Sequence, residues 1–223
     1  MPALYIIATP IGNLEDITSR ALRILKQVDL ILCEDTRVTK KLLNYYNINT
    51  LVESYHQHSK VRKINYILNL LKKNKNLALV SDSGTPGISD PGNKLIQFLT
   101  FNSQFPVKIV PVPGSNAAIA AASISGFPMD KFIFMGFPPH KKGRNKYFKE
   151  IAESKYPIII YESPHRIIKT LNELSEFRNF EIVVGRELTK KFETIYRGKI
   201  KDIINQIKPK GEFTIVINKI NKK

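Results

Sequence analysis

The chain has 223 residues, and its 35 Lys and Arg against 19 Asp and Glu give a formal net charge of +16. Hydrophobic residues make up 43% and charged residues 24%, a balance that excludes a disordered chain and allows one large domain or two small ones. The one cysteine, Cys33, excludes an internal disulfide framework and a multi-cysteine zinc site.

No apolar run approaches the roughly 18 residues that a membrane helix needs. The first apolar run, residues 4–8, has no basic residue before it and does not resemble a signal peptide. We therefore expect a soluble, cytoplasmic protein.

In the first half of the chain, short apolar runs alternate with segments of helical periodicity. The predicted strands are residues 4–8, 30–33, 77–80 and 107–110, and the predicted helices are residues 18–28, 36–46 and 61–71. We expect the last two strands to be buried on both faces. This alternation predicts an α/β fold with a mostly parallel sheet and helices on both faces.

The segment Val110-Pro-Val-Pro-Gly-Ser115 interrupts the chain after the fourth strand, and we place a domain boundary there. Residues 1–113 would form an N-terminal α/β domain and residues 114–223 a C-terminal domain. Further helices are expected at 116–125, 144–152, 166–174 and 201–207, and further strands at 132–137, 158–161, 182–185, 193–196 and 213–218. Because few helices separate the later strands, the second domain is predicted to be α+β with a mixed sheet.

A long polar loop, Ser81-Asp-Ser-Gly-Thr-Pro-Gly-Ile-Ser-Asp-Pro-Gly92, directly follows a predicted strand. Its glycines allow close backbone approach and its prolines stiffen it, and ligands of α/β sheets bind beyond the carboxyl ends of strands. Its acids and hydroxyls suit a cationic ligand, such as an amino acid or a sulfonium; the alternative is a self-contained Ω-loop. Asn93 stands where a P-loop needs Lys, which excludes ATP hydrolysis at this loop.

A second loop, residues 111–116, leads into an Ala-rich helix whose N-terminus could hold a carboxylate. Small residues such as Ala117 would let a flat ring lie against that helix, although plain helix–sheet packing also favours Ala. Three other predicted strands end in segments that combine acids with arginines: Glu34-Asp35-Thr36-Arg37, Tyr161-Glu162-Ser163-Pro164-His165-Arg166 and Arg186-Glu187. Such segments carry either catalytic groups or structural ion pairs.

The clearest basic cluster is residues 136–149, which contain five Lys and Arg, no acid, and the aromatics Phe137, Tyr147 and Phe148. Cations contact RNA phosphates and exposed aromatics stack on unpaired bases. We therefore expect RNA contacts from Lys141, Lys142, Arg144 and Lys146. The alternative is a loop that enters an amphipathic helix with its aromatics in the core.

Seven motifs follow one another in order between residue 4 and about residue 217. They are Ala8-Thr-Pro-Ile-Gly-Asn-Leu14, Cys33-Glu-Asp-Thr-Arg37, the loop 81–92, Val112-Pro-Gly-Ser-Asn-Ala-Ala118, Phe134-Met-Gly-Phe137, Tyr161-Glu-Ser-Pro-His-Arg166 and Arg186-Glu-Leu-Thr-Lys190. Together they resemble the ribosomal RNA small subunit methyltransferase I family of the tetrapyrrole methylase superfamily. The resemblance implies a dimeric two-domain protein that binds S-adenosylmethionine in a cleft between its domains and methylates the 2′-oxygen of a cytidine ribose in the decoding region of 16S ribosomal RNA.

The resemblance also implies a set of cofactor-binding residues, namely Pro10, Gly12, Asp82, Gly84, Thr85, Pro86, Ser115, Asn116, Ala117, Tyr161 and Glu162. From their positions at strand ends, Asp35, Glu34 and Glu187 are candidates for the base that accepts the hydroxyl proton. Arg37, Arg166 and Arg186 are expected to contact RNA in addition to the basic cluster. No metal is expected, because His56 and His58 have no neighbouring ligand pattern.

Two other functions remain open at this point. A methyltransferase that acts on a tetrapyrrole would share the fold, although the charge of +16 favours RNA. A non-catalytic RNA-binding protein would share the basic cluster, but it would not bind S-adenosylmethionine in the absence of RNA.

Overall fold

A computed structural model describes residues 1–56, 61–102 and 105–219. Contacts within it divide the chain into two compact units, Met1–Asn116 and Ala117–Lys223. The domain boundary expected between residues 113 and 114 stays a prediction, because contacts alone do not define functional domains.

The N-terminal unit contains a parallel five-stranded sheet in the order β3-β2-β4-β1-β5. The strands are β1 (Ala3–Ile7), β2 (Leu30–Cys33), β3 (Val52–Ser54), β4 (Leu77–Leu79) and β5 (Lys108–Val112). The helices are η1 (Leu14–Asp16), α1 (Ser19–Gln27), α2 (Thr36–Tyr45), α3 (Val61–Lys72), α4 (Asn93–Gln97) and η2 (Phe98–Asn102).

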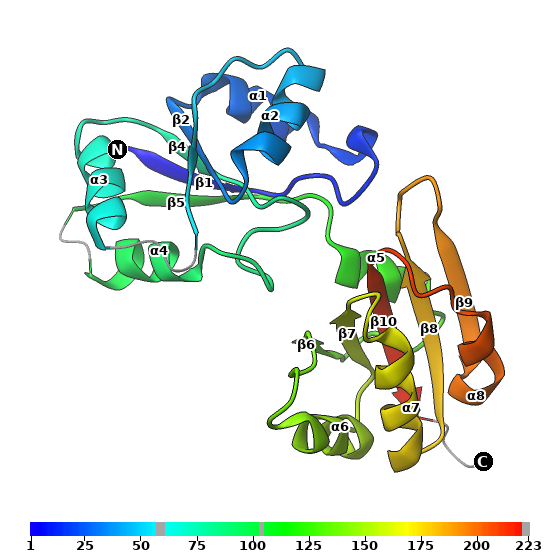
Figure 1. The fold of residues 1–223 in the computed structure, drawn as a ribbon. Helices are drawn as coiled ribbons and strands as arrows, with labels where there is room; N and C mark the ends of the chain where they lie inside the picture. The colour runs from blue at the N-terminus through cyan, green and yellow to red at the C-terminus, as the bar shows by residue number, and fades with distance from the viewer. Residues whose placement is uncertain (57–60, 103–104, 220–223) are drawn as a thin grey trace. The chain divides into compact units, whose positions relative to one another are not determined.

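Helices cover both faces of this sheet (Figure 1). Ile7, Ile31 and Val80 point to the face that packs against α1 and α2, while Leu4, Leu32 and Leu79 point to the face that packs against α3 and α4. Alternate residues of one strand thus enter different cores, and every strand of the sheet centre must be apolar throughout. The predicted α/β class, with helices on both faces, is confirmed.

Three details of the first unit differ from expectation. The strand predicted at 107–110 is not buried on both faces, because β5 lies at the sheet edge, pairs only with β1 and exposes Lys108. The three-residue strand β3 was not predicted. Nor was α4, which begins directly after Gly92, buries Leu95 and continues into the buried Leu99.

The C-terminal unit contains a mixed sheet in the order β6-β7-β10-β8-β9, in which only β6 and β7 are parallel. Its strands are β6 (Ile133–Gly136), β7 (Ile158–Glu162), β8 (Phe180–Arg186), β9 (Thr194–Lys199) and β10 (Phe213–Lys219). Its helices are α5 (Ala117–Ser123), α6 (Arg144–Glu153), α7 (Ile167–Phe177), α8 (Ile200–Ile203) and η3 (Ile204–Gln206). The predicted mixed sheet is confirmed.

One face of this second sheet packs against α6, α7 and α8 in a core of Ile, Leu, Val and Phe. The short helix α5 packs on β7, β8 and β10, and it buries Ala118, Ala121 and Ala122. The alanines of α5 therefore serve helix–sheet packing, since small side chains let the helix lie close to the strands.

Candidate cofactor and RNA site

Three loops of the N-terminal unit meet at the carboxyl edge of its sheet, after β1, β4 and β5. Thr9 and Gly84 exchange backbone hydrogen bonds, of 2.9 Å from the Thr9 N–H and 3.1 Å from the Gly84 N–H. The Thr85 hydroxyl donates to the Ser115 carbonyl over 3.1 Å. These bonds bring together the loops that contain Pro10 and Gly12, Asp82 to Pro86, and Ser115.

Glycine is required at two points where these loops approach one another. Gly84 has a left-handed φ of +78°, and a Cβ there would lie 3.4 Å from Ile11 Cγ2. A Cβ at Gly114 would lie 3.0 Å from Ala8 Cβ. At both points a side chain in place of glycine would therefore meet the neighbouring loop, and glycine allows the loops to pack closely.

Carboxylates from two neighbouring strands gather at the same edge. Asp82 accepts the Asp35 N–H over 2.9 Å, which ties the loop after β2 to the loop after β4. Burial, and then the charge of Asp82, raises the pKa of Glu34. Burial also raises the pKa of Asp90 to about 6 against the opposing hydrogen bond from Ser81, and the charges of Glu34 and Asp82 add smaller contributions in the same direction as burial. Together these carboxylates create a negative electrostatic potential that favours a cationic ligand.

A pocket of about 200 Å³ opens beside these loops. Pro10 and Asp82 belong to its wall, which is formed by Thr9, Pro10, Leu14, Val38, Thr39, Lys41, Leu42, Ser81 and Asp82. Its floor thus comes from the turns after β1 and β4, and its side from α2. Gly12 is exposed at the surface near this edge.

The three candidate bases differ in their surroundings. The Asp35 carboxylate caps α2 by accepting the Arg37 N–H over 2.8 Å and pairs with the Arg37 guanidinium at 2.6 Å, which lowers its pKa to about 2. Burial raises the pKa of Glu187, but its bonds to the Glu212 N–H and to Lys190 outweigh that effect and leave the pKa below the ordinary value. Of the three, only Glu34 has a raised pKa, and it is the carboxylate best suited to accept a proton near neutrality.

Tyr161 and Glu162 end β7 in the C-terminal unit. The Tyr161 hydroxyl accepts the Ala118 N–H over 3.2 Å, and its ring meets those of Phe134 and Phe137 edge-on at 5.0 and 5.5 Å. The aromatic residues and the first turn of α5 therefore form one structural group.

The Glu162 side chain is fully buried. It pairs with Arg166 at 2.8 Å, and it accepts the Ser163 N–H over 2.7 Å and the Thr170 hydroxyl over 2.5 Å. These partners occupy both carboxylate oxygens. Any contact from Glu162 to a cofactor would have to come from its main chain.

The basic cluster divides into exposed and buried cations. Lys141, Lys142 and Lys146 are exposed, as expected for phosphate contacts. Arg144 is only 8% exposed. Its guanidinium donates to Glu173 over 2.6 Å, to the Thr170 hydroxyl over 2.8 Å and to the Pro139 carbonyl over 2.9 Å. The predicted RNA contact from Arg144 is therefore not supported, since its donors serve the fold.

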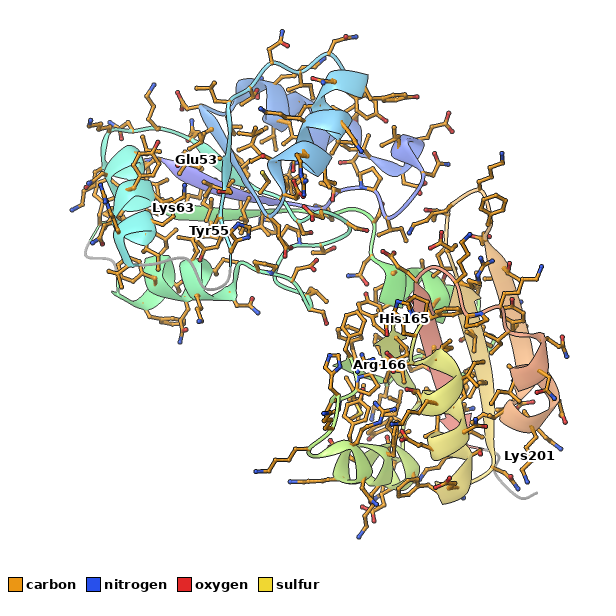
Figure 2. The ribbon with its side chains drawn as sticks, in the orientation of Figure 1. Glu53, Tyr55, Lys63, His165, Arg166 and Lys201 are labelled. Atoms are coloured by element: carbon orange, nitrogen blue, oxygen red, sulfur yellow. The ribbon has the colours of Figure 1, made fainter. Side chains whose placement is uncertain are left out.

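Arg166, at the start of α7, has a related structural role (Figure 2). Besides its ion pair with Glu162, it donates to the Pro138 carbonyl over 3.0 Å. Arg144 and Arg166 thus hold two consecutive carbonyls of the loop that carries the exposed lysines. Of the aromatics in the cluster, Phe148 is buried in the core and Phe137 is exposed.

Arg186, the remaining arginine of the prediction in this unit, is also buried. Its guanidinium donates to the Lys210 carbonyl over 2.6 Å and to the Phe192 carbonyl over 3.1 Å. Its donors hold a turn rather than face solvent. The Arg37 side chain, by contrast, is 86% exposed although it pairs with Asp35.

In the described part of the chain, no group of three or more His, Cys, Asp or Glu side chains is placed to hold a metal ion. His56 is exposed, and His58 lies outside the described residues. No helix within residues 1–56, 61–102 and 105–219 is both long and apolar enough to cross a membrane.

Comparisons with known proteins show the family of this chain. The model of the Tetrapyrrole (Corrin/Porphyrin) Methylases matches residues 3–204. Ribosomal RNA small subunit methyltransferase I of Synechocystis sp. is 44% identical over 97% of this chain and 79% of its own length. The protein of that name from Thermotoga maritima is 42% identical over 98% of this chain and 99% of its own length. The chain belongs to this family of methyltransferases.

Solved structures of two methyltransferases share the fold. The methyltransferase CobJ superposes with a TM-score of 0.72 at 16% identity, covering 98% of this chain and 95% of its own. The cobalt precorrin-4 methyltransferase CbiF superposes with a TM-score of 0.69 at 21% identity, covering 96% and 94%. Membership of this family implies a methyl donor of the S-adenosylmethionine type.

The residues of this methylase fit such a donor. The donor carries a sulfonium and an ammonium group, and the carboxylates of Glu34, Asp82 and Asp90 supply the opposite charge. In the sequence, Asp90 is only one polar residue of its loop. The packing that brings it near Glu34 and Asp82 leaves no pattern in the neighbouring residues.

Proposed function

We propose that this protein transfers a methyl group from S-adenosylmethionine to the 2′-oxygen of a cytidine ribose in the decoding region of 16S ribosomal RNA. We place this activity in the cytoplasm and in a homodimer. The observation that carries the proposal is the set of hydrogen bonds from Thr9 to Gly84 and from Thr85 to Ser115, which joins three loops into one cradle. The relatives named ribosomal RNA small subunit methyltransferase I support the choice of RNA.

In this proposal the cofactor is held by backbone and small side chains. The N-terminal unit contributes Pro10, Gly12, Asp82, Gly84, Thr85, Pro86, Ser115 and Asn116. When bound, S-adenosylmethionine supplies an electrophilic methyl group on a positively charged sulfur. The carboxylates of Asp82 and Asp90 favour binding of that positive charge, and the rigid loops fix its position. Positioning of this kind can correspond to effective molarities of about 10⁵ M or more.

Glu34 is the proposed proton acceptor. With the donor bound, the ribose 2′-oxygen would bond to the methyl carbon as the methyl–sulfur bond breaks and leaves a neutral thioether, and the Glu34 carboxylate would accept the hydroxyl proton. A base in this position typically contributes about 10²- to 10⁴-fold. The raised pKa of Glu34 makes it a stronger base than Asp35, whose pKa Arg37 holds at about 2.

The RNA is captured by exposed cations. Lys141, Lys142 and Lys146 contact phosphates, while Arg144 and Arg166 hold the loop that carries them. Arg37 is exposed at the edge that carries the carboxylates, and in this proposal it contacts the substrate backbone. Such contacts confer affinity that falls steeply with salt.

Two measurements test the proposal. Calorimetry should detect binding of S-adenosylmethionine to the protein in the absence of RNA, which a non-catalytic RNA-binding protein would not show. Methyl transfer should then require small-subunit RNA, and a porphyrinoid offered in its place should accept no methyl group. A folded sample that releases no heat with the donor, or that methylates the porphyrinoid instead, contradicts the proposal.

A further inference from the structure

The turn that joins β8 to β9, residues 187–193, is held in an unfavourable backbone conformation. Glu187 has a φ of 53° and Thr189 a φ of 65°, both in the left-handed region. Residues with a Cβ adopt this region only where surrounding contacts enforce it, and such strain is concentrated at functional sites. The turn joins two long strands of the C-terminal unit (Figure 1).

Contacts from both sides enforce this conformation. The buried guanidinium of Arg186 bonds the carbonyls of Lys210 and Phe192. Lys190 pairs with Glu187 at 3.1 Å and with Glu212 at 2.9 Å. These bonds tie the turn to the segment that precedes β10, so that both ends of the turn are fixed.

The acidic side chains of the turn are engaged by these contacts. Glu187 and Glu212 share Lys190, and Glu193 accepts the Thr189 N–H over 2.6 Å. Leu188 is the buried apolar residue of the turn, and the other contacts of this network are polar. The polar network fixes the shape of the turn and the position of the side chains that the turn exposes.

The turn exposes the aromatic ring of Phe192 and the ammonium group of Lys191. Phe192 is 65% exposed, and the Lys191 ammonium lies 5.7 Å from its ring centroid. Lys208 and Lys210 are also exposed, in the segment that Arg186 holds against the turn. Single exposed apolar residues are common on proteins. Here, however, the ring stands on a strained and heavily bonded turn among lysines.

We propose that Phe192 stacks on an unpaired base of the substrate RNA while Lys191 contacts an adjacent phosphate. This inference rests on the proposed function, because it takes RNA as the substrate. Proteins recognise unpaired RNA by stacking bases on aromatic side chains, and each base has a π-face that can stack. Arg186 and Glu187 then act as positioning residues for Phe192.

The absence of tryptophan from the chain makes a direct test available. The variant Phe192→Trp gives a protein with one tryptophan, located at the turn. A single-stranded RNA oligonucleotide should quench its fluorescence, whereas heparin, a polyanion without bases, should not. The matched control is Phe101→Trp, which replaces a phenylalanine that is 79% exposed in the N-terminal unit and should show no quenching.

Affinity provides a second readout. Phe192→Ala should weaken RNA binding by about 5-fold to 150-fold, the range of one base–aromatic stack, and Phe192→Tyr should restore it. Affinity for S-adenosylmethionine should be the same in the wild type, Phe192→Ala and Phe192→Tyr. Unchanged RNA affinity in Phe192→Ala, or unquenched tryptophan fluorescence of Phe192→Trp in an RNA complex, overturns the inference.

The same samples separate this inference from the proposed function. A wild-type protein that binds RNA but transfers no methyl group to it contradicts the proposed function, while quenching in Phe192→Trp still supports stacking. If the fluorescence of Phe192→Trp changes with protein concentration and not with RNA, the turn docks on a second copy of the chain, and the inference fails.

Discussion

Arg144 offers a sharp test of how the basic cluster works, because it is buried among exposed lysines. Its guanidinium makes bonds of 2.6, 2.8 and 2.9 Å to Glu173, Thr170 and Pro139. Removal of one partner from a buried ion pair destabilises a protein by about 3–5 kcal/mol. Because the Glu173 side chain is 29% exposed, we expect Arg144→Gln to lower the free energy of unfolding by about 3 kcal/mol, near the lower limit.

The contrasting variant replaces Lys141, Lys142 and Lys146 with Gln. These side chains are exposed, so each change should alter the free energy of unfolding by less than about 0.5 kcal/mol. Each lost phosphate contact should lower the salt slope of RNA binding by about 0.7, or about 2 for the triple variant. Arg144→Gln should weaken RNA binding without this change in slope, because it loosens the loop but removes no phosphate contact.

Urea unfolding followed by circular dichroism, together with RNA titrations at several salt concentrations, measures both effects. Arg144→Lys is the matched control: it keeps the charge but not the forked donor geometry, and it should be intermediate in stability. Arg144→Gln could instead unfold at the same urea concentration as the wild type and show a salt slope of RNA binding that is lower by about 0.7. That result would show that Arg144 contacts phosphate, and its structural role would be refuted.

Other predictions concern the carboxyl edge of the first sheet. The folded-state pKa of Asp90 lies above its ordinary value, so the wild type loses stability as pH rises from about 4 to 6; Asp90→Asn should unfold at higher urea than the wild type at pH 7 and lose this advantage below about pH 4. Gly84→Ala places a Cβ on left-handed backbone and should lower the free energy of unfolding by about 1–2 kcal/mol and weaken donor binding in calorimetry, which a wild-type affinity would refute. Asp35→Ala should lower the melting temperature because α2 loses its cap, whereas Asp35→Asn, which keeps an acceptor for the Arg37 N–H, should not. In single-turnover assays, Glu34→Gln should lower the methyl-transfer rate by about 10²-fold or more, while Glu187→Gln should not affect it once RNA is saturating; equal rates for Glu34→Gln and the wild type would exclude Glu34 as the base.

Much of the fold could be predicted from local patterns. Strands such as β2 and β4 are continuous apolar runs because both of their faces enter a core, and α3 has a regular helical stripe because one of its faces does. The strand β3 escaped prediction because its three residues, Val52–Ser54, include Glu53 and Ser54 and form no apolar run. The edge position of β5 escaped it because the order of strands in a sheet depends on contacts distant in sequence.

The parts of the candidate site that depend on local backbone conformation could be predicted from the sequence. The parts that depend on hydrogen-bond partners distant in the sequence could not. Glycines and prolines between 81 and 92 indicate a rigid loop wherever the sheet places it. Arg144, by contrast, could not be distinguished from the lysines around it, since Glu173 and Thr170 reach it from a helix more than 25 residues along the chain. The same holds for Glu162, whose burial depends on α7.

The cradle around Gly84 and Ser115 should deliver a methyl group to a ribose of ribosomal RNA. To observe this step, tritium-labelled S-adenosylmethionine and unmethylated 16S RNA are supplied to the purified protein, and the RNA is then hydrolysed in alkali. A methylated 2′-oxygen cannot attack the neighbouring phosphodiester, so we expect label in an alkali-resistant dinucleotide that begins with cytidine. Label released in mononucleotides, or none in RNA that the folded protein binds together with the donor, would contradict this transfer.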